Sequence, residues 1–316
     1  MGFWTAFQAM ASLTILFALG YGLARAGWIS TEVELFLPRF LTGIVIPPYL
    51  AGNIVTHFSH DEFLQLISGS IVPALSMVLS AVLFYVIAVL VRVDRTHRQV
   101  FVVAATASNT LYIGIPVNLA LFGDAALPFV LLYFFANTTF FWCVGSYLLA
   151  LEGDGGSGKH SFRDSVRRTF SPPMCGVIAG VLLLVAGIPM PRVILDACGL
   201  LGNLATPLAL IFLGATLYRV DWKSVHMGKD VLAGLVCRLA IGPLVIVGLL
   251  YLFPLPNDMA QVFIIQSGLP AMASLPVLVA YYGADKQFAS VLVALSTILG
   301  MLTVPVWMGC MHLLVP

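Results

Sequence analysis

The chain has 316 residues, of which 60% are hydrophobic and only 9% are charged, whereas a soluble domain carries roughly 25% charged residues. So few polar side chains cannot cover a water-soluble globule, which excludes a soluble protein and predicts that the lipid bilayer covers much of the surface. The net charge of +1 comes without a basic cluster interleaved with aromatic residues, so no nucleic-acid partner is indicated.

Charged residues divide the chain into ten long apolar segments. Each is long enough to cross a hydrocarbon layer of about 30 Å as a helix, which rises about 1.5 Å per residue. The segments do not alternate between polar and apolar residues, so helices are favoured over a β-barrel. We therefore predict an all-α integral membrane protein with ten transmembrane helices. The segments are 1–24, 40–60, 63–91, 99–123, 125–151, 169–191, 197–218, 231–257, 259–284 and 287–316.

Basic residues predict the orientation. The first segment has no Lys or Arg ahead of it, so it lacks the basic region of a secretory signal and is expected to be the first spanning helix. If both termini lie outside, every Lys and Arg except Arg192 and Arg238 falls in a cytoplasmic loop. Because basic residues are retained on the cytoplasmic side, we predict a multi-pass protein of the cell (inner) membrane with both termini outside.

The longest polar connection divides the chain in the middle. It contains Gly-Asp-Gly-Gly-Ser-Gly, a composition typical of flexible linkers. We expect a first five-helix unit over 1–151, a cytoplasmic linker over 152–168, and a second five-helix unit over 169–316.

The two units share spaced glycines and prolines. A shift of the chain by 160 residues superposes five pairs of residues that set backbone geometry: Gly20 with Gly180, Gly27 with Gly187, Pro47 with Pro207, Pro116 with Pro276, and Gly123 with Gly283. Because five is an odd number, a second copy enters the membrane from the opposite face. The sequence therefore predicts two inverted repeats, a plan of secondary transporters whose site lies between the repeats at the membrane midplane.

Glycine and proline interrupt the fourth and ninth segments near their centres. The interruptions are Ser108–Pro116 and Ser267–Pro276. Proline removes a backbone donor and should unwind or kink each helix there. Unpaired backbone groups are tolerated in a membrane only where protein or a wet cavity satisfies them. We predict one shared cavity, in which the half-helices beginning near Pro116 and Pro276 offer N–H groups to an anion.

Polar residues beside the interruptions are candidate ligands. Asn109 can offer a donor and an acceptor to a substrate, or it can brace the unwound backbone. Asn137 can point into the same cavity, or it can hold helices together. Arg238 can balance a substrate carboxylate, pair with another helix, or extend its head back to the cytoplasmic interface. Ser274 and Gln266 give weaker signals. The predicted substrate-binding residues are Asn109, Tyr112, Gly114, Pro116, Asn137, Arg238, Pro270, Ser274 and Pro276.

The sequence indicates neither an enzyme nor a cofactor. No segment combines a nucleophile with a nearby base, and the cysteines stand singly, with no spacing that suggests a metal or a disulfide: Cys143, Cys175, Cys198, Cys237 and Cys310. A passive channel would need continuous polar faces, whereas polarity is concentrated at the two interruptions. Because no Asp or Glu lies within a segment, the coupling ion, H⁺ or Na⁺, stays open.

The interruptions also carry a family resemblance over essentially the whole chain. It resembles the auxin efflux carrier (PIN-like) superfamily, and specifically its compact prokaryotic members, because the cytoplasmic linker is short. The residues that carry the resemblance are Asn109–Pro116 with Phe122 and Gly123, Leu269 and Pro270 with Pro276, Arg238 with Pro243, and Ser296 and Gly300–Leu302 with Pro305.

The resemblance implies a fold like that of the bile-acid sodium symporters. Helices 1, 2, 6 and 7 would form a scaffold, against which helices 3–5 and 8–10 would move as an elevator. A carboxylate-bearing substrate would bind near the crossing of helices 4 and 9, at Asn109, at the segments of Pro116 and Pro276, and at Asn137. Malonate and malate are associated with several compact members. We therefore expect a secondary transporter of small organic anions. The alternative is a sodium-coupled symporter of the bile-acid type. The protein partner considered is a second copy of the chain, in a homodimer.

Overall fold

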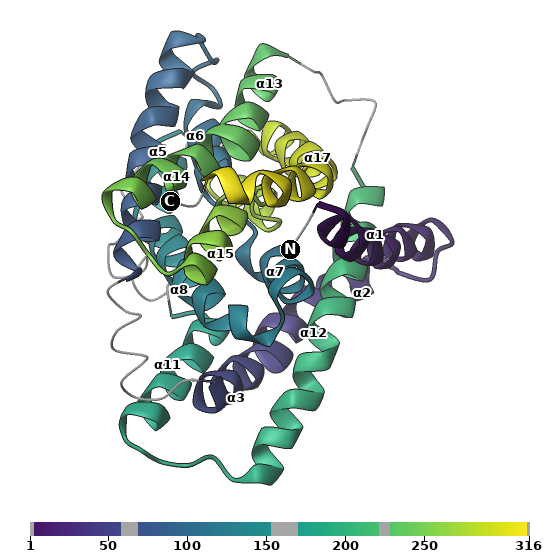
Figure 1. Ribbon diagram of the computed structural model, residues 1–316. Helices are drawn as coiled ribbons and strands as arrows, with labels where there is room; N and C mark the ends of the chain where they lie inside the picture. Colours follow the sequence, from purple (N-terminus) through teal and green to yellow (C-terminus); the bar gives the residue numbers. More distant parts are fainter. Residues whose placement is uncertain (1–2, 58–68, 153–169, 221–227, 315–316) are drawn as a thin grey trace.

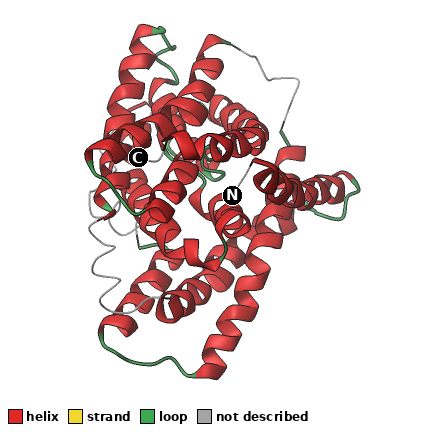
Figure 2. Cartoon of the chain, in the orientation of Figure 1, coloured by secondary structure: helices red, strands yellow, loops and turns green. Residues whose placement is uncertain are grey.

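The computed structural model describes residues 3–57, 69–152, 170–220 and 228–314, and these residues are almost entirely helical (Figures 1 and 2). The first half contains α1 (Phe3–Arg25), α2 (Thr31–Phe40), η1 (Leu41–Val45), α3 (Ile46–His57), α5 (Ile71–Leu90), α6 (Arg98–Thr106), η2 (Thr110–Gly114), α7 (Ile115–Phe122), η3 (Asp124–Ala126), α8 (Leu127–Phe140), η4 (Phe141–Gly145) and α9 (Ser146–Glu152). The second half contains α11 (Pro172–Val185), α12 (Arg192–Tyr218), α13 (Lys229–Val236), η6 (Cys237–Ile241), α14 (Gly242–Leu252), α15 (Asn257–Ser267), α16 (Leu275–Tyr281) and α17 (Lys286–Leu314).

Seven helices within these ranges are long and apolar enough to cross a membrane. They correspond to seven of the ten predicted segments. The fourth and ninth segments are interrupted, and the sixth is the short helix α11, which Pro172 and Pro173 begin and which ends before Gly187, whose φ of 64° does not fit a helix. The predicted all-helical architecture is confirmed for the described residues, and the seven long apolar helices agree with an integral membrane protein, while the full set of ten spanning helices stays a prediction.

Two of the predicted segments begin well after the start of their helices. The second segment begins near Thr31 rather than at 40, because the Ser30 hydroxyl caps the helix by accepting the Val33 N–H at 3.3 Å. This helix therefore includes Glu32, Glu34 and Arg39. The seventh segment likewise begins earlier than predicted, at Arg192. Charged residues mark the end of an apolar run, but a helix continues until its backbone is capped.

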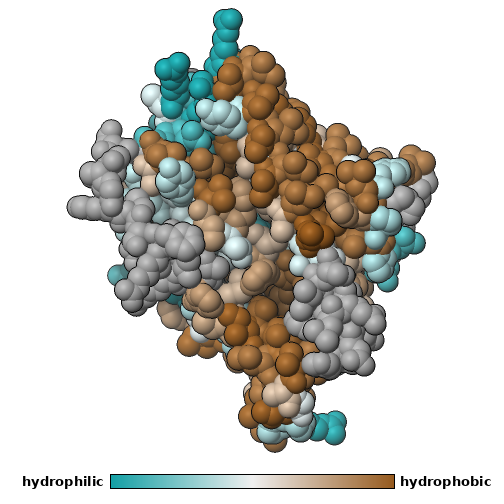
Figure 3. Space-filling view, turned by 90° about the vertical axis from the view of Figure 1, so that its left-hand side faces the viewer, coloured by the Kyte–Doolittle hydropathy of each residue, from teal (hydrophilic) through white to brown (hydrophobic). Residues whose placement is uncertain are grey.

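The outer surface of the helices is strongly apolar. Leu90, Leu200 and Val82 are 74%, 70% and 60% exposed, respectively. Figure 3 shows one face on which hydrophobic residues cover most of the described surface. Large exposed apolar areas are rare on soluble monomers, so lipid is the expected surrounding.

Prolines set the position of most of the wide helical turns. The π-helical turns η1, η2 and η6 each end two residues before a proline, namely Pro47, Pro116 and Pro243. Proline cannot donate to the carbonyl four residues earlier and crowds it, so the turn widens. At η6, the carbonyl of Leu239 instead accepts a hydrogen bond of 2.9 Å from Nε1 of Trp307.

The helices form two packed groups (Figure 1). In the first, α1 packs on α12, and α3 packs on both α11 and α12; with α2 these form the α12 group. In the second, α5 packs on α6, α8 and α14, and α15 and α17 join them; α5 to α9 and α13 to α17 form the α5 group. The groups meet where α1 contacts α7 and α17, and where η2 contacts α12.

The spacing of 160 residues reappears in the backbone. Within the described ranges, the glycines with positive φ are the predicted pairs Gly27 (79°) and Gly187 (64°), and Gly123 (74°) and Gly283 (76°). Helices α6 and α7, shifted by 160, coincide within one residue with α15 and α16. The two halves thus repeat their turns at the predicted interval.

Close contacts repeat at the same interval. A Cβ added to Gly20 would overlap the backbone of Ile211, and one added to Gly180 would lie 3.0 Å from the backbone of Ala51. Both glycines and both partners are related by the shift of 160. Small residues at these points let the backbones of α1 and α12, and those of α11 and α3, approach each other closely, as is common between membrane helices.

Replacing Gly20 with alanine should therefore destabilise the α12 group. The added methyl group must push apart two helix backbones, and overpacking of this kind costs about 1–3 kcal/mol. Thermal unfolding of the purified protein in detergent measures the effect. Gly22 in the same helix has open space at its Cβ position, so Gly22→Ala is the matched control and should be neutral or stabilising. Equal melting temperatures of the two variants would contradict the tight contact.

Candidate functional site

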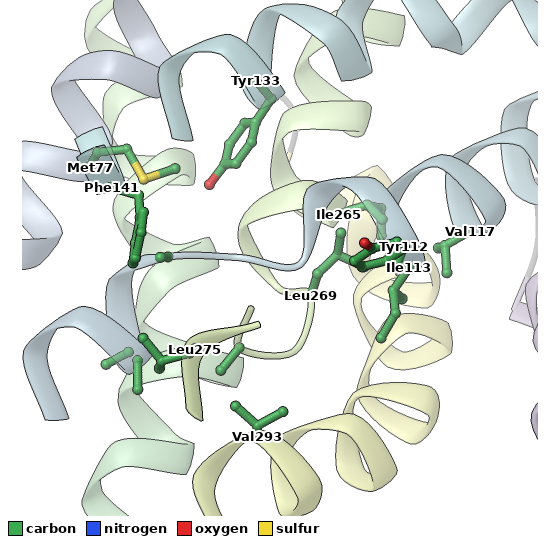
Figure 4. Close-up of a cluster of buried hydrophobic side chains, with 14 of the residues drawn as sticks. Met77, Tyr112, Ile113, Val117, Tyr133, Phe141, Ile265, Leu269, Leu275 and Val293 are labelled. Atoms are coloured by element: carbon green, nitrogen blue, oxygen red, sulfur yellow. The ribbon is translucent and has the colours of Figure 1, made fainter. Parts of the chain in front are cut away.

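The two interrupted helices meet at a crossing formed by residues 107–109 and 268–274. The backbone N–H of Asn109 donates to the carbonyl of Pro270 at 2.9 Å, and the N–H of Met272 donates to the carbonyl of Ala107 at 3.2 Å. Ser108 and Ala271 thereby form an isolated antiparallel bridge. The predicted interruptions of both helices are confirmed, and their unwound backbones pair with each other. In Figure 4, Leu269 of the second interruption lies beside Tyr112 and Ile113 of the first.

Two buried side chains brace the crossing from neighbouring helices. On α8, the Asn137 amide accepts the Ser108 N–H at 2.9 Å and donates to the Ser108 carbonyl at 3.1 Å. On α17, the Ser296 hydroxyl accepts the Ala271 N–H at 3.1 Å. Of the two roles predicted for Asn137, its geometry matches holding helices together, because both ends of its amide on α8 bind the backbone of Ser108 in the other segment. No pattern in the sequence predicts this role for Ser296.

Arg238 lies next to the crossing and is 2% exposed. Its Nη1 donates to the carbonyls of Ala105 and Thr106 at 2.8 and 2.6 Å. Its Nη2 donates to the Ser108 hydroxyl at 2.8 Å and to the Ser267 carbonyl. The side chain does not extend back to the cytoplasmic interface, so that alternative is wrong. The side chain extends from the widened turn η6 into the protein interior, where it donates to four oxygens of α6, α15 and the crossing.

The charge of Arg238 has only neutral partners. All four bonded oxygens belong to backbone carbonyls or a hydroxyl. The ion pairs found in the described part of the chain involve His97 and Arg219, not Arg238. A buried charge without a counter-charge is costly. The crossing therefore carries a positive charge that an anion could balance.

Several buried amide groups around the crossing have no hydrogen-bond partner among the described residues. The Asn109 Oδ1 accepts the Tyr112 N–H at 3.3 Å, but its Nδ2 is unpaired. Both polar atoms of the Gln266 side chain are unpaired, and this residue is fully buried. Gly114 lies directly against Gln266, since a Cβ on Gly114 would be 2.6 Å from its Oε1. Buried polar groups normally find partners, so these amides are available to a ligand.

A cavity of about 550 Å³ reaches the second interruption from between the two helix groups. Leu213 and Thr216 of α12 line one side, and Ala273, Pro276 and Thr297 line the other. Arg219 and Lys286, for which the sequence predicts the cytoplasmic side, also line it. Arg219 forms an ion pair with Glu34 and donates to the Ile29 carbonyl at 3.0 Å. The wall of the cavity thus carries Lys286 together with the ion pair of Arg219 and Glu34.

The structure brings most of the predicted site residues together. Asn109, Tyr112, Gly114, Asn137, Arg238 and Pro270 lie in or beside the crossing. Tyr112 also reaches α12, with its ring 5.5 Å from that of Phe212. Pro276 lines the cavity, and the half-buried Ser274 precedes α16 without a side-chain capping bond. Pro116 is buried in the first turn of α7.

Three further polar residues at the site are not among the substrate-binding residues predicted from the sequence. Ser108 and Ser267 supply oxygens to Arg238, and Tyr133 points its hydroxyl toward the crossing (Figure 4). No pattern separates these residues from the many other buried serines and tyrosines of the spans. The described residues hold no group of three or more His, Cys, Asp or Glu side chains that could bind a metal.

Known proteins resemble the chain along most of its length. A transporter from Methanothermobacter thermautotrophicus, described as uncharacterized, is 27% identical over 303 residues, which cover 95% of this chain and 96% of the relative. An uncharacterized transporter from Methanocaldococcus jannaschii is 21% identical over 300 residues, covering 93% and 94%. The family model described as membrane transport protein matches residues 5–308. The chain therefore belongs to the membrane transport protein family, the auxin efflux carrier-like family that its crossing motif resembles.

Proposed function

We propose that this chain is a secondary transporter of small organic anions, carboxylates in particular. The observation that carries the proposal is the buried charge of Arg238, which binds both interrupted helices and has no carboxylate partner among the described residues. A charge inside a membrane protein is expensive and usually functional. A carboxylate at the crossing would supply the missing negative charge, and the unpaired amides of Asn109 and Gln266 would supply donors.

The proposed architecture is ten spanning helices in two inverted repeats, 1–151 and 169–316. The repeated positive-φ glycines and the matched contacts of Gly20 and Gly180 support it. The α12 group is the proposed scaffold, because glycines fix its helices at close range. The α5 group holds the crossing and is the proposed moving part of an elevator. The cavity between the groups, beside Arg219 and Lys286, is then the route from the cytoplasmic side.

The substrate would be a small mono- or dicarboxylate, and malonate and malate are the first candidates by family resemblance. A thermal-shift screen of the purified protein against such acids, with organic cations of similar size as controls, identifies the substrate class. Stabilisation should follow mass action and rise with ligand concentration. Stabilisation by cations alone would contradict an anion site.

Replacing Asn109 with alanine tests the site directly. The change removes the Nδ2 donor and the bond that holds the Tyr112 N–H. A hydrogen bond to a charged group contributes about 1.5–3 kcal/mol, so substrate affinity should fall by about 10- to 100-fold. Uptake of labelled carboxylate into proteoliposomes measures this loss. Asn203→Ala, which changes an exposed asparagine of α12, is the control. Unaltered uptake by the Asn109 variant would remove this residue from the site.

A further inference from the structure

Two helices end side by side at the crossing, and one guanidinium group caps both. Helix α6 ends at Thr106 and helix α15 ends at Ser267. The last carbonyls of a helix lack intrahelical partners and lie at the negative end of its dipole. Arg238 donates hydrogen bonds to the carbonyls of Ala105 and Thr106 in the first helix and to that of Ser267 in the second.

This set of oxygens is the kind that binds a cation. In carriers with discontinuous helices, unwound carbonyls and the C-terminal ends of half-helices coordinate the coupling Na⁺ near the substrate. Here three such carbonyls and the Ser108 hydroxyl converge, but Arg238 donates to all four. A Na⁺ ion would have to displace the guanidinium to use these oxygens.

The remaining space beside Arg238 does not favour a second cation. A polar cavity of about 10 Å³, lined by Ser76, Ser80, Thr106 and Tyr133, borders the guanidinium. That volume is roughly the space of one water-sized probe. An ion in it would lie next to a fixed positive charge, and no Asp or Glu lines the cavity to offset the repulsion.

We propose that Arg238 is a resident cation that takes the place of a coupling Na⁺ at the crossing, so that anion binding and transport are independent of Na⁺. The inference rests on the proposed function, because it concerns the same anion site. It gives Arg238 a positioning role: its charge holds the C-terminal ends of α6 and α15 together and attracts the anion to the opposite side of the crossing. Because the cation is covalently part of the chain, it moves with the α5 group and does not dissociate.

The first test compares uptake of labelled malonate or malate by the unaltered protein in Na⁺ and in choline buffers. We expect rates that agree within about 2-fold. A stimulation by Na⁺ of 10-fold or more would overturn the inference and leave the proposed function intact. Absence of carboxylate uptake and of any carboxylate-induced stabilisation in both buffers would instead contradict the proposed function.

The second test replaces the resident cation. Arg238→Ala should lose carboxylate binding by 10-fold or more in choline buffer, and added guanidinium at about 10 mM should restore part of it. The control is Arg192→Ala, which removes an exposed arginine at the start of α12. It should bind carboxylate as the unaltered protein does, with and without added guanidinium. A folded Arg238→Ala protein that binds carboxylate normally, or that guanidinium does not rescue, would overturn the inference.

Arg238→Lys keeps the test decisive if the alanine variant does not fold. Lysine retains the positive charge but not the fork of donors, so binding should weaken while staying independent of Na⁺. A lysine variant whose binding becomes dependent on Na⁺ would overturn the proposed role of the charge.

Discussion

Replacing Asn137 with alanine is expected to abolish transport and to destabilise the α5 group. The Asn137 amide satisfies both the N–H and the carbonyl of Ser108, which is 1% exposed. Its loss leaves two buried backbone groups without these partners, and each such group costs about 1–3 kcal/mol. The Ser108 hydroxyl also accepts a hydrogen bond of 2.8 Å from Nη2 of Arg238. The same change should therefore disturb the charged group next to the crossing.

Melting temperature and carboxylate uptake should be measured together for this variant. Thr138→Ala is the matched control, since Thr138 is the next residue on α8 and, among the described residues, its side chain forms no hydrogen bond with the crossing. We expect the control to keep both properties. If Asn137→Ala transports normally and melts with the unaltered protein, then the crossing does not depend on the brace from α8.

Gly300 of α17 packs against Pro270 of the crossing, and replacing it with valine should block transport. A Cβ at Gly300 would lie 2.7 Å from Cγ and 3.0 Å from Cδ of Pro270. The proline ring is rigid and its carbonyl pairs with Asn109, so the strain must pass to the crossing itself. Overpacking of a tight contact costs about 1–3 kcal/mol. We expect uptake to fall by 10-fold or more, because the protein groups that donate hydrogen bonds to the substrate must be held in place for the substrate to bind.

Gly248 provides a control for the helix-propensity cost of valine. It also lies within a helix of the α5 group, α14, but has open space at its Cβ position. Gly248→Val should therefore retain uptake. Equal losses in the two variants would assign the effect to the helix backbone rather than to the contact with Pro270.

Local chemistry made much of the fold predictable. Pro116 and Pro276 interrupt two helices because proline lacks a donor, a property that no tertiary contact restores. Gly27 and Gly187 adopt positive φ as a repeated pair because glycine alone takes that conformation without strain. By contrast, the apolar pattern does not predict the start of the second helix at Thr31, since charged residues end an apolar run without ending a helix.

The sequence by itself determined the class of protein, the position of both interruptions and the family, because these depend on composition and on residues that act on their own backbone. Only the tertiary structure decided what Arg238 and Asn137 do. The groups that Arg238 binds lie up to 133 residues away in the chain, and the partner of Asn137 lies 29 residues away. Which oxygen meets a buried donor depends on how distant helices pack, and no local pattern encodes that distance.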